Sequence, residues 1–201
     1  MRFYQSILVV VLFTIVSAAS ANIIVNGSFE NPPLINPAAS YNSGATFGNW
    51  TVIKGDIELI NGYWLDAQGI QSLDLNGINP GGVKQVVSTV ANQWYKLRFA
   101  MAGNTYVAAT TMDMEVYWNG NVVDTCHFNT AGYTWSNMGW TYFEYNVKAV
   151  SSSTELRFES ISTAYSNAGP ALDDVSLVAI PEPVTVSFLG LGIGALLFKR
   201  R

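Results

Sequence analysis

The stretch "MDMEVYWNGNVV", residues 112–123, decides the fold class of this chain. Its first half is apolar at every second position, at Met112, Met114, Val116 and Trp118. Such alternation is typical of a strand with one buried face. Asn119-Gly120 follows and separates two apolar segments, which is the strongest short signal for a β-hairpin. The stretch therefore predicts two antiparallel strands joined by a tight turn.

The same period of two recurs on both sides of this hairpin, in "YKLRFAM" (95–101) and "TELRFESI" (154–161). Glycine, asparagine and proline separate such stretches at intervals of roughly 10 residues, and no convincing helical period stands between Asn22 and Val178. We therefore expect an all-β protein, an antiparallel β-sandwich. Residues 31–48 interrupt the pattern and are interpreted as a long, turn-rich surface insertion.

The N-terminus has the layout of a secretory signal peptide. Arg2 precedes an apolar segment from Ile7 to Val16, and "SAASAN" then offers small residues at Ala19 and Ala21. We expect residues 1–21 to be removed, so that the mature chain begins at Asn22. The alternative is an N-terminal membrane anchor, for which the apolar segment is short.

The C-terminus ends in "IPEPVTVSFLGLGIGALLFKRR", residues 180–201. Pro181, Glu182 and Pro183 precede an apolar run at 184–198, and three positive charges close the chain. As a helix this run would be about 22 Å long, shorter than the ~30 Å hydrocarbon core of a bilayer. We expect a short transmembrane helix with a basic tail, preceded by Pro181, Glu182 and Pro183.

Charge and cysteine content narrow the function classes. The whole chain has a net charge of −4, and the region between the two terminal segments is more acidic still. An acidic body argues against a nucleic-acid partner, which needs a basic face. Cys126 is the single cysteine, so the chain cannot form an internal disulfide, and a bound metal ion could provide a similar constraint.

The sequence offers little for catalysis. His127 is the single histidine and adjoins Cys126, but neighbours on a strand point to opposite faces. Neither a G-x-S-x-G elbow nor an H-E-x-x-H metal motif occurs. Hydrolysis of a glycoside needs two carboxylates facing each other, and the 14 acids single out no such pair. We therefore predict that the protein is not an enzyme.

Aromatic residues fall into two groups. Trp50, Trp94, Trp118 and Trp140 lie in or beside strand patterns and are expected in the core. A second group lies among turn residues, where exposed rings can cover the apolar face of a sugar while polar side chains bond its hydroxyls. We predict a ligand-binding site from Trp64, Trp135, Tyr133, Tyr106, Asp66 and Asn104. The alternative is that these loop aromatics pack back onto the sandwich.

An ordered set of motifs extends from residue 22 to residue 178: "NIIVNGSFENP", "NWTVIKGDIELI", "GIQSLDLNG", "PGGVKQVV", "YKLRFAMAGN" and "GPALDDVSL". This set resembles the choice-of-anchor C family, bacterial relatives of plant cell-wall proteins with galactose-binding-like jelly-roll domains. The resemblance implies one such domain over 22–178, with its first and last strands side by side. It also implies a structural calcium ion joining them through Glu30, Asp173 and Asp174, carboxylates of the kind that Ca²⁺ prefers.

The terminal segment 179–201 resembles the PEP-CTERM sorting signal of Gram-negative bacteria. That resemblance implies a transient membrane anchor, cleavage near Pro181–Pro183 by an exosortase-type membrane protease, and a place at the cell surface or in the extracellular matrix. Together these observations predict an exported, non-catalytic protein that binds a polysaccharide such as exopolysaccharide or cell-wall glycan. The alternatives are a structural matrix protein without a sugar pocket and a secreted polysaccharide hydrolase.

Overall fold

The structure is a computed structural model that describes residues 21–181, except for 108, 164 and 166. Residues 1–20 of the expected signal peptide, Glu182, Pro183, the apolar run at 184–198 and the basic tail lie outside these residues. Within the described part, no helix is long and apolar enough to cross a bilayer.

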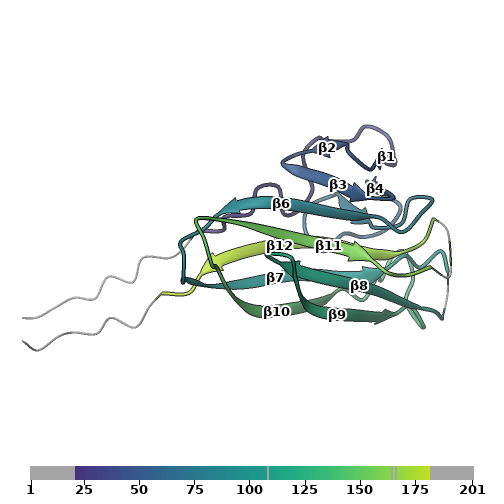
Figure 1. Cartoon of the computed structure of the whole chain (residues 1–201). Coiled ribbons are helices and arrows are strands. Elements are labelled where there is room, and N and C mark those ends of the chain that lie inside the picture. The colour runs from purple at the N-terminus through teal and green to yellow at the C-terminus, as the bar shows by residue number, and fades with distance from the viewer. Residues whose placement is uncertain (1–20, 108, 164, 166, 182–201) are drawn as a thin grey trace, which may run out of the picture.

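Two six-stranded sheets, in which every pair of neighbouring strands is antiparallel, account for the described chain (Figure 1). The first sheet has the order β1 (Ala38–Asn42), β4 (Asp56–Ile60), β5 (Ser72–Asp74), β12 (Pro170–Ala179), β7 (Trp94–Gly103) and β10 (Thr141–Lys148). The second has the order β2 (Thr46–Phe47), β3 (Trp50–Lys54), β6 (Gly82–Ser88), β11 (Ser153–Ser160), β8 (Thr111–Trp118) and β9 (Asn121–Asn129). The predicted all-β antiparallel sandwich is confirmed.

The hairpin predicted from residues 112–123 is the β8–β9 pair. Trp118 pairs with Asn121 in the ladder, and Asn119 and Gly120 form the turn between them. Both turn residues have positive φ, 51° and 78°, as the tight hairpin turn requires. The alternation along β8 is also confirmed, since Met112, Met114 and Val116 are buried while the residues between them are half-buried.

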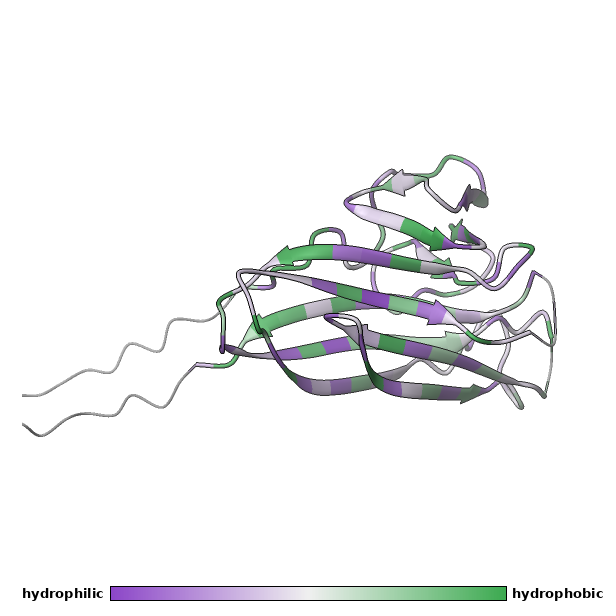
Figure 2. Cartoon of the chain, in the orientation of Figure 1, coloured by the Kyte–Doolittle hydropathy of each residue, from purple (hydrophilic) through white to green (hydrophobic). Residues whose placement is uncertain are grey.

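Aromatic side chains join the two sheets in the core. The Phe99 ring of β7 stacks on Phe143 of β10 at 5.5 Å and meets Phe158 of β11, in the opposite sheet, edge-on at 5.0 Å. Trp50 of β3 is fully buried and lies 5.4 Å from Phe29 and 6.3 Å from Phe158. Figure 2 shows the alternation of apolar and polar residues along the strands that produces this core.

The four strand tryptophans do not all lie in the core. Trp50 and Trp118 are buried as expected, and Trp140 is partly buried. The prediction for Trp94 is wrong, because its side chain is 45% exposed. Trp94 begins β7 directly before the buried Tyr95, so the period of two points its ring outward, where Lys148 lies 5.9 Å away.

Residues 31–48 are not the uninterrupted loop that the sequence predicts. They contain β1, which extends the first sheet beside β4, and β2, which extends the second sheet beside β3. β1 shows no alternation of buried and exposed residues, because an edge strand with a polar sequence has no clearly buried face. The insertion therefore supplies one edge strand to each sheet.

The first and last segments of the described chain lie side by side, as the family resemblance implies. Asn22 forms a bridge with Val178, and the Ile23 N–H donates to the Leu177 carbonyl at 3.0 Å. The Val175 N–H donates to the Gly27 carbonyl at 2.9 Å. Residues 21 and 181 consequently lie at the same end of the sandwich (Figure 1).

Candidate functional site

A pocket of about 310 Å³ opens over the outer face of the first sheet. Its floor includes Glu58 and Ile60 of β4. Glu58 is half-buried and lies on the face opposite the fully buried Leu59, whereas Ile60 is itself buried and belongs to the core. Three loops and the segment after β4 complete the lining. The full set is Glu58, Ile60, Tyr63, Trp64, Asn104, Tyr106, Trp135 and Asn167. Half of these eight side chains are aromatic.

Four of the six side chains predicted for a ligand site line this pocket: Trp64, Trp135, Tyr106 and Asn104. Tyr133 is not among the lining residues. Its ring packs 5.3 Å from Phe128 and fills the space beside Gly139. Asp66 is also absent from the lining and acts behind it, through Ser72. The fold thus brings four of the predicted residues together from distant loops. The other two, Tyr133 and Asp66, contact residues behind or beside the pocket.

Trp64 differs from the exposed ring that the sequence suggests, because it is only 5% exposed. Its Nε1–H donates to Ser72 Oγ at 2.8 Å, and Ser72 Oγ donates to Asp66 Oδ1 at 2.6 Å. This chain of hydrogen bonds fixes the indole as a wall of the pocket. The accessible rings are instead Tyr63, Tyr106 and Trp135, which are 51%, 73% and 57% exposed.

Two loops from distant parts of the chain hold Trp135 in place. The Leu65 N–H donates to the Trp135 carbonyl at 2.9 Å, and Trp140 Nε1–H donates to the Leu65 carbonyl at 2.8 Å. These contacts tie the 61–71 loop to the 130–140 loop at Trp135 itself and at Trp140. Trp140, which the sequence places in the core, thereby helps to position the pocket.

Asn104 is buried and its amide is already occupied. Its Nδ2 donates to Asp74 Oδ2 at 2.7 Å and to the Asn167 carbonyl at 3.3 Å, and its Oδ1 accepts from the Tyr106 N–H at 2.9 Å. The main role of Asn104 is therefore to position two lining residues, Tyr106 and Asn167, and its amide has little hydrogen-bonding capacity left for a ligand. Burial raises the pKa of Asp74 to about 7, against the hydrogen bonds from Asn76, Asn104 and Gly169, which lower it.

Glu58, Tyr63 and Asn167 are lining residues that the sequence reasoning missed. Tyr63 directly precedes Trp64 in a turn-rich segment, so the criterion that selected Trp64 could have selected it as well. Glu58 carries no such signal, since "DIELI" is an ordinary strand pattern. Only the pairing of β4 with β5 places its carboxylate at the floor of a pocket.

The three acids predicted to bind calcium separate into two environments. Asp174 points to Arg98, with Oδ2 2.8 Å from Nη1. Glu30 and Asp173 both reach the 61–71 loop instead. Glu30 Oε1 accepts from the Ile70 and Gln71 N–H groups at 2.8 and 2.9 Å. Asp173 Oδ2 accepts from the Ala67 and Gln68 N–H groups at 2.9 and 2.8 Å. These contacts tie both chain ends to the loop directly.

Like charges lie close together within this acidic region. Burial raises the pKa of Asp173 to about 8; backbone N–H donors oppose the shift and the charge of Asp66 adds to it. Burial also raises the pKa of Asp66, the Ser72 hydrogen bond opposes this, and the charge of Glu30 adds to it. The acidic character fits a cation, but no three of these ligand types converge on one point within the described residues.

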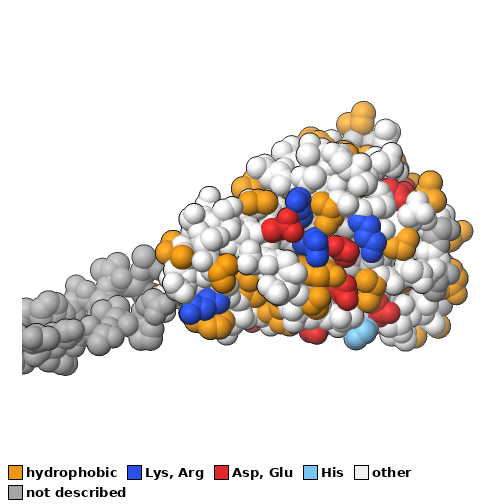
Figure 3. All heavy atoms as spheres, in the orientation of Figure 1, with side chains coloured by type: hydrophobic (Ala, Val, Ile, Leu, Met, Phe, Trp, Pro, Cys, Tyr) orange, Lys and Arg blue, Asp and Glu red, His pale blue; other side chains and the backbone are white. Residues whose placement is uncertain are grey.

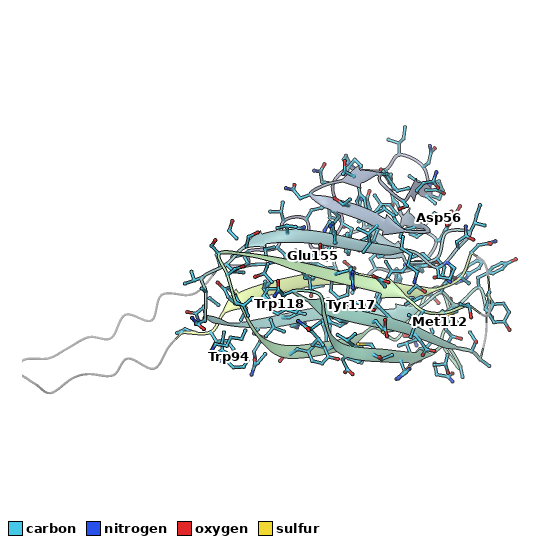
Figure 4. The ribbon with its side chains drawn as sticks, viewed as in Figure 1. Asp56, Trp94, Met112, Tyr117, Trp118 and Glu155 are labelled. Carbon is cyan, nitrogen blue, oxygen red and sulfur yellow. The ribbon has the colours of Figure 1, made fainter. Side chains whose placement is uncertain are left out.

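The outer face of the second sheet has a different character. Lys84 Nζ lies 2.8 Å from Glu155 Oε2, and Arg157 Nε lies 3.0 Å from Glu159 Oε1. Figure 3 shows these opposite charges side by side on the face, and Figure 4 shows Tyr117 and Glu155 on its strands. Paired charges on a flat sheet make a solvated surface, so the apolar pocket on the first sheet is the stronger candidate site.

Comparison with solved structures supports the jelly-roll type of sandwich. A family 61 carbohydrate-binding module, TmCBM61, solved in complex with β-1,4-galactotriose, is 18% identical and has a TM-score of 0.50; the match covers 80% of this chain and 100% of that chain. A family 35 carbohydrate-binding module from Clostridium thermocellum is 15% identical with a TM-score of 0.45, covering 77% of this chain and 95% of that one. The match to TmCBM61 is the one that supports this type of sandwich, and at 18% identity the likeness concerns the fold alone.

Sequence comparison finds a curated relative and a family. Halomucin of Haloquadratum walsbyi is 29% identical over an alignment of 177 residues that covers 84% of this chain. The chain spans only 2% of the length of halomucin. The family model described as "Protein of unknown function (DUF642)" matches residues 22–178, so the chain belongs to the DUF642 family.

Proposed function

We propose that this protein binds carbohydrate, without transforming it, in the pocket on the outer face of the first sheet. The observation that carries the proposal is the convergence of Trp64, Tyr106 and Trp135 on one pocket from three distant loops. Flat rings cover the apolar face of a pyranose, and Glu58 and Asn167 offer polar groups to its hydroxyls. A volume of about 310 Å³ is at the small end for ligand pockets, which suits a short stretch of a glycan.

The composition of the pocket supports binding over catalysis. Glu58 is the one carboxylate among the described lining residues, whereas glycoside hydrolysis uses two facing carboxylates. Its neighbour on β5, Asp74, is fully buried and holds Asn104. Cys126 is buried, while His127 is exposed and contacts Asp113 at 2.7 Å, so the two adjacent residues do not face each other.

Retention on immobilised polysaccharides tests the proposal. The purified protein should bind at least one exopolysaccharide or cell-wall glycan and elute with the matching free oligosaccharide. Failure to bind any glycan in a broad panel would remove the sugar-binding function. That result would favour a structural matrix protein of the same fold.

We further propose that the protein is exported and sorted by an exosortase-type protease, as its terminal segments and its resemblance to the choice-of-anchor C family suggest. The last strand ends before Ile180, whose N–H donates to the Trp94 carbonyl at 2.8 Å. Cleavage near Pro181–Pro183 would therefore leave the sandwich whole. Mass spectrometry of protein extracted from the cell surface should show a C-terminus near Pro183, and an intact Arg201 there would contradict the proposal.

Calcium is a further proposal, for which the supporting observation is that Glu30 and Asp173 both contact the 61–71 loop, which carries Asp66, so that like charges repel there. Calcium added to metal-free protein should raise the melting temperature by several degrees, because an ion would offset that repulsion. Asp173→Asn should abolish the rise. Asp174→Asn is the matched control and should retain it, since Asp174 contacts Arg98. An unchanged melting temperature in the unmutated protein would show that the amide contacts alone tie the chain ends.

A further inference from the structure

The pocket contains one charge for which residues 21–181, as far as they are described, provide no positive partner. Glu58 is the only charged side chain among the described residues that line it. Glu58 Oε1 accepts a hydrogen bond from Ser40 Oγ at 3.1 Å, and within the described residues no hydrogen bond reaches Oε2. The carboxylate is half-buried, so it is partly shielded from solvent. One of its oxygens is thus available to a ligand in the pocket.

The surroundings of Glu58 are acidic. Asp74 is its partner in the β4–β5 ladder and lies fully buried behind the pocket. The charge of Glu58 contributes to the raised pKa of Asp74, after the larger effect of burial. Asp66 lies behind the adjoining wall, where it accepts the hydrogen bond from Ser72. A negative charge entering the pocket would therefore meet the carboxylate of Glu58 directly, with Asp66 and the partly protonated Asp74 behind it.

The positive side chains of the described residues all lie elsewhere. Three are paired on the outer face of the second sheet: Lys54 with Glu159, Lys84 with Glu155, and Arg157 with Glu159. The other three belong to β7 and β10: Lys96 and Arg98 contact Glu144, and Lys148 lies over Trp94. No lysine or arginine of the described residues is therefore placed to pair with an acidic ligand in the pocket.

From this charge arrangement we infer that the pocket selects uncharged or amine-bearing sugars and rejects acidic ones, such as uronates and sulfated sugars. An uncharged pyranose donates its hydroxyl hydrogens to Glu58 while the aromatic rings cover its apolar face. A free ammonium group gains from both the carboxylate and the rings. A carboxylate or sulfate on the ligand meets a like charge in a partly desolvated site. The inference rests on the proposed function of the pocket.

Calorimetry with matched oligosaccharides tests the inference, using pairs that differ only in a C6 carboxylate. Suitable pairs have the same linkage in both members: α-1,4-linked galacto-oligosaccharide against α-1,4-linked oligogalacturonate, and β-1,4-linked gluco-oligosaccharide against β-1,4-linked oligoglucuronate. In the pair that binds, we expect the affinity of the acidic member to be lower by at least about tenfold. This difference should shrink at high salt. Equal or tighter binding of the acidic member would overturn the inference and leave the sugar-binding function intact. Absence of binding to both members of every pair would count against the function itself.

Two glutamate variants assign the selectivity to its source. Glu58→Gln removes the charge and keeps the side-chain shape, so the ratio between the two affinities should fall to about threefold or less. Glu144→Gln makes the same change on β10, where Glu144 contacts Lys96 and Arg98, and should leave the ratio unchanged. A ratio that stays the same in Glu58→Gln overturns the role of Glu58. Thermal unfolding of both variants confirms that each is folded before binding is compared.

Discussion

Trp135→Ala is expected to weaken glycan binding by about 30-fold or more, roughly 2 kcal/mol, which is the scale of an aromatic hot spot. The Trp135 ring is 57% exposed and lines the pocket, so its loss removes stacking area. Its backbone carbonyl accepts from the Leu65 N–H, and alanine keeps that bond. The loop is therefore expected to hold its shape, and the loss should come from the missing ring.

Trp94→Ala is the matched control for this variant. Trp94 is 45% exposed, close to the value for Trp135, but it begins β7 while Asn104 follows the end of that strand, about 30 Å away. Figure 4 shows Trp94 at the end of the sandwich where the chain ends leave. Binding should be unchanged in Trp94→Ala. Equal glycan affinity of Trp135→Ala and Trp94→Ala would show that the glycan does not bind in this pocket.

The second large effect concerns stability. Trp50→Ala should lower the free energy of unfolding by about 3–5 kcal/mol, the usual range for deleting a large buried aromatic side chain. Trp50 is fully buried between Phe29 and Phe158, and its Nε1–H donates to the Asn26 carbonyl at 2.9 Å. The substitution leaves a cavity and removes the hydrogen bond that joins β3 to the N-terminal segment.

Urea unfolding followed by circular dichroism measures this loss. Trp94→Ala again serves as control, because the same chemical change at an exposed site should cost about 1 kcal/mol at most, including the contact with Lys148. If Trp50→Ala were as mild as Trp94→Ala, the N-terminal segment would not depend on Trp50 for its place. That outcome would question the packing of residues 22–30 against the sandwich.

Much of the sandwich could be predicted because the alternation of apolar and polar residues along a strand indicates which face is buried. β7, β8 and β11 follow the alternation of their sequences, and Asn119-Gly120 marks its own turn. The errors occur where this alternation is weak or was not applied. β1 is a polar edge strand, and Trp94 was assigned by its chemistry although Tyr95 beside it fixes the opposite face.

The candidate site was predictable only in part. Trp135, Tyr106 and Asn104 could be selected because each stands among turn residues, and loops at the ends of a sandwich carry binding groups. The sequence did not predict that these residues converge on one pocket, and it did not predict that Trp64 is buried beneath them. Asp66 and Tyr133 share the same chemistry and the same kind of loop, yet hydrogen bonding to Ser72 and packing on Phe128 remove them from the lining.

The sequence by itself determined the strands with a clear alternation, such as β8 and β11, their apolar faces and the β8–β9 hairpin, since these depend on residues one or two positions apart. Tertiary structure alone decided that Glu58 would lie at the floor of an aromatic pocket and that the six positive side chains of residues 21–181 would lie away from it. The physical reason is that the pocket is assembled by strand order. β4, β5, β12 and β7 become neighbours through pairings between segments that are far apart in the chain, and the loops beside them meet only as a consequence.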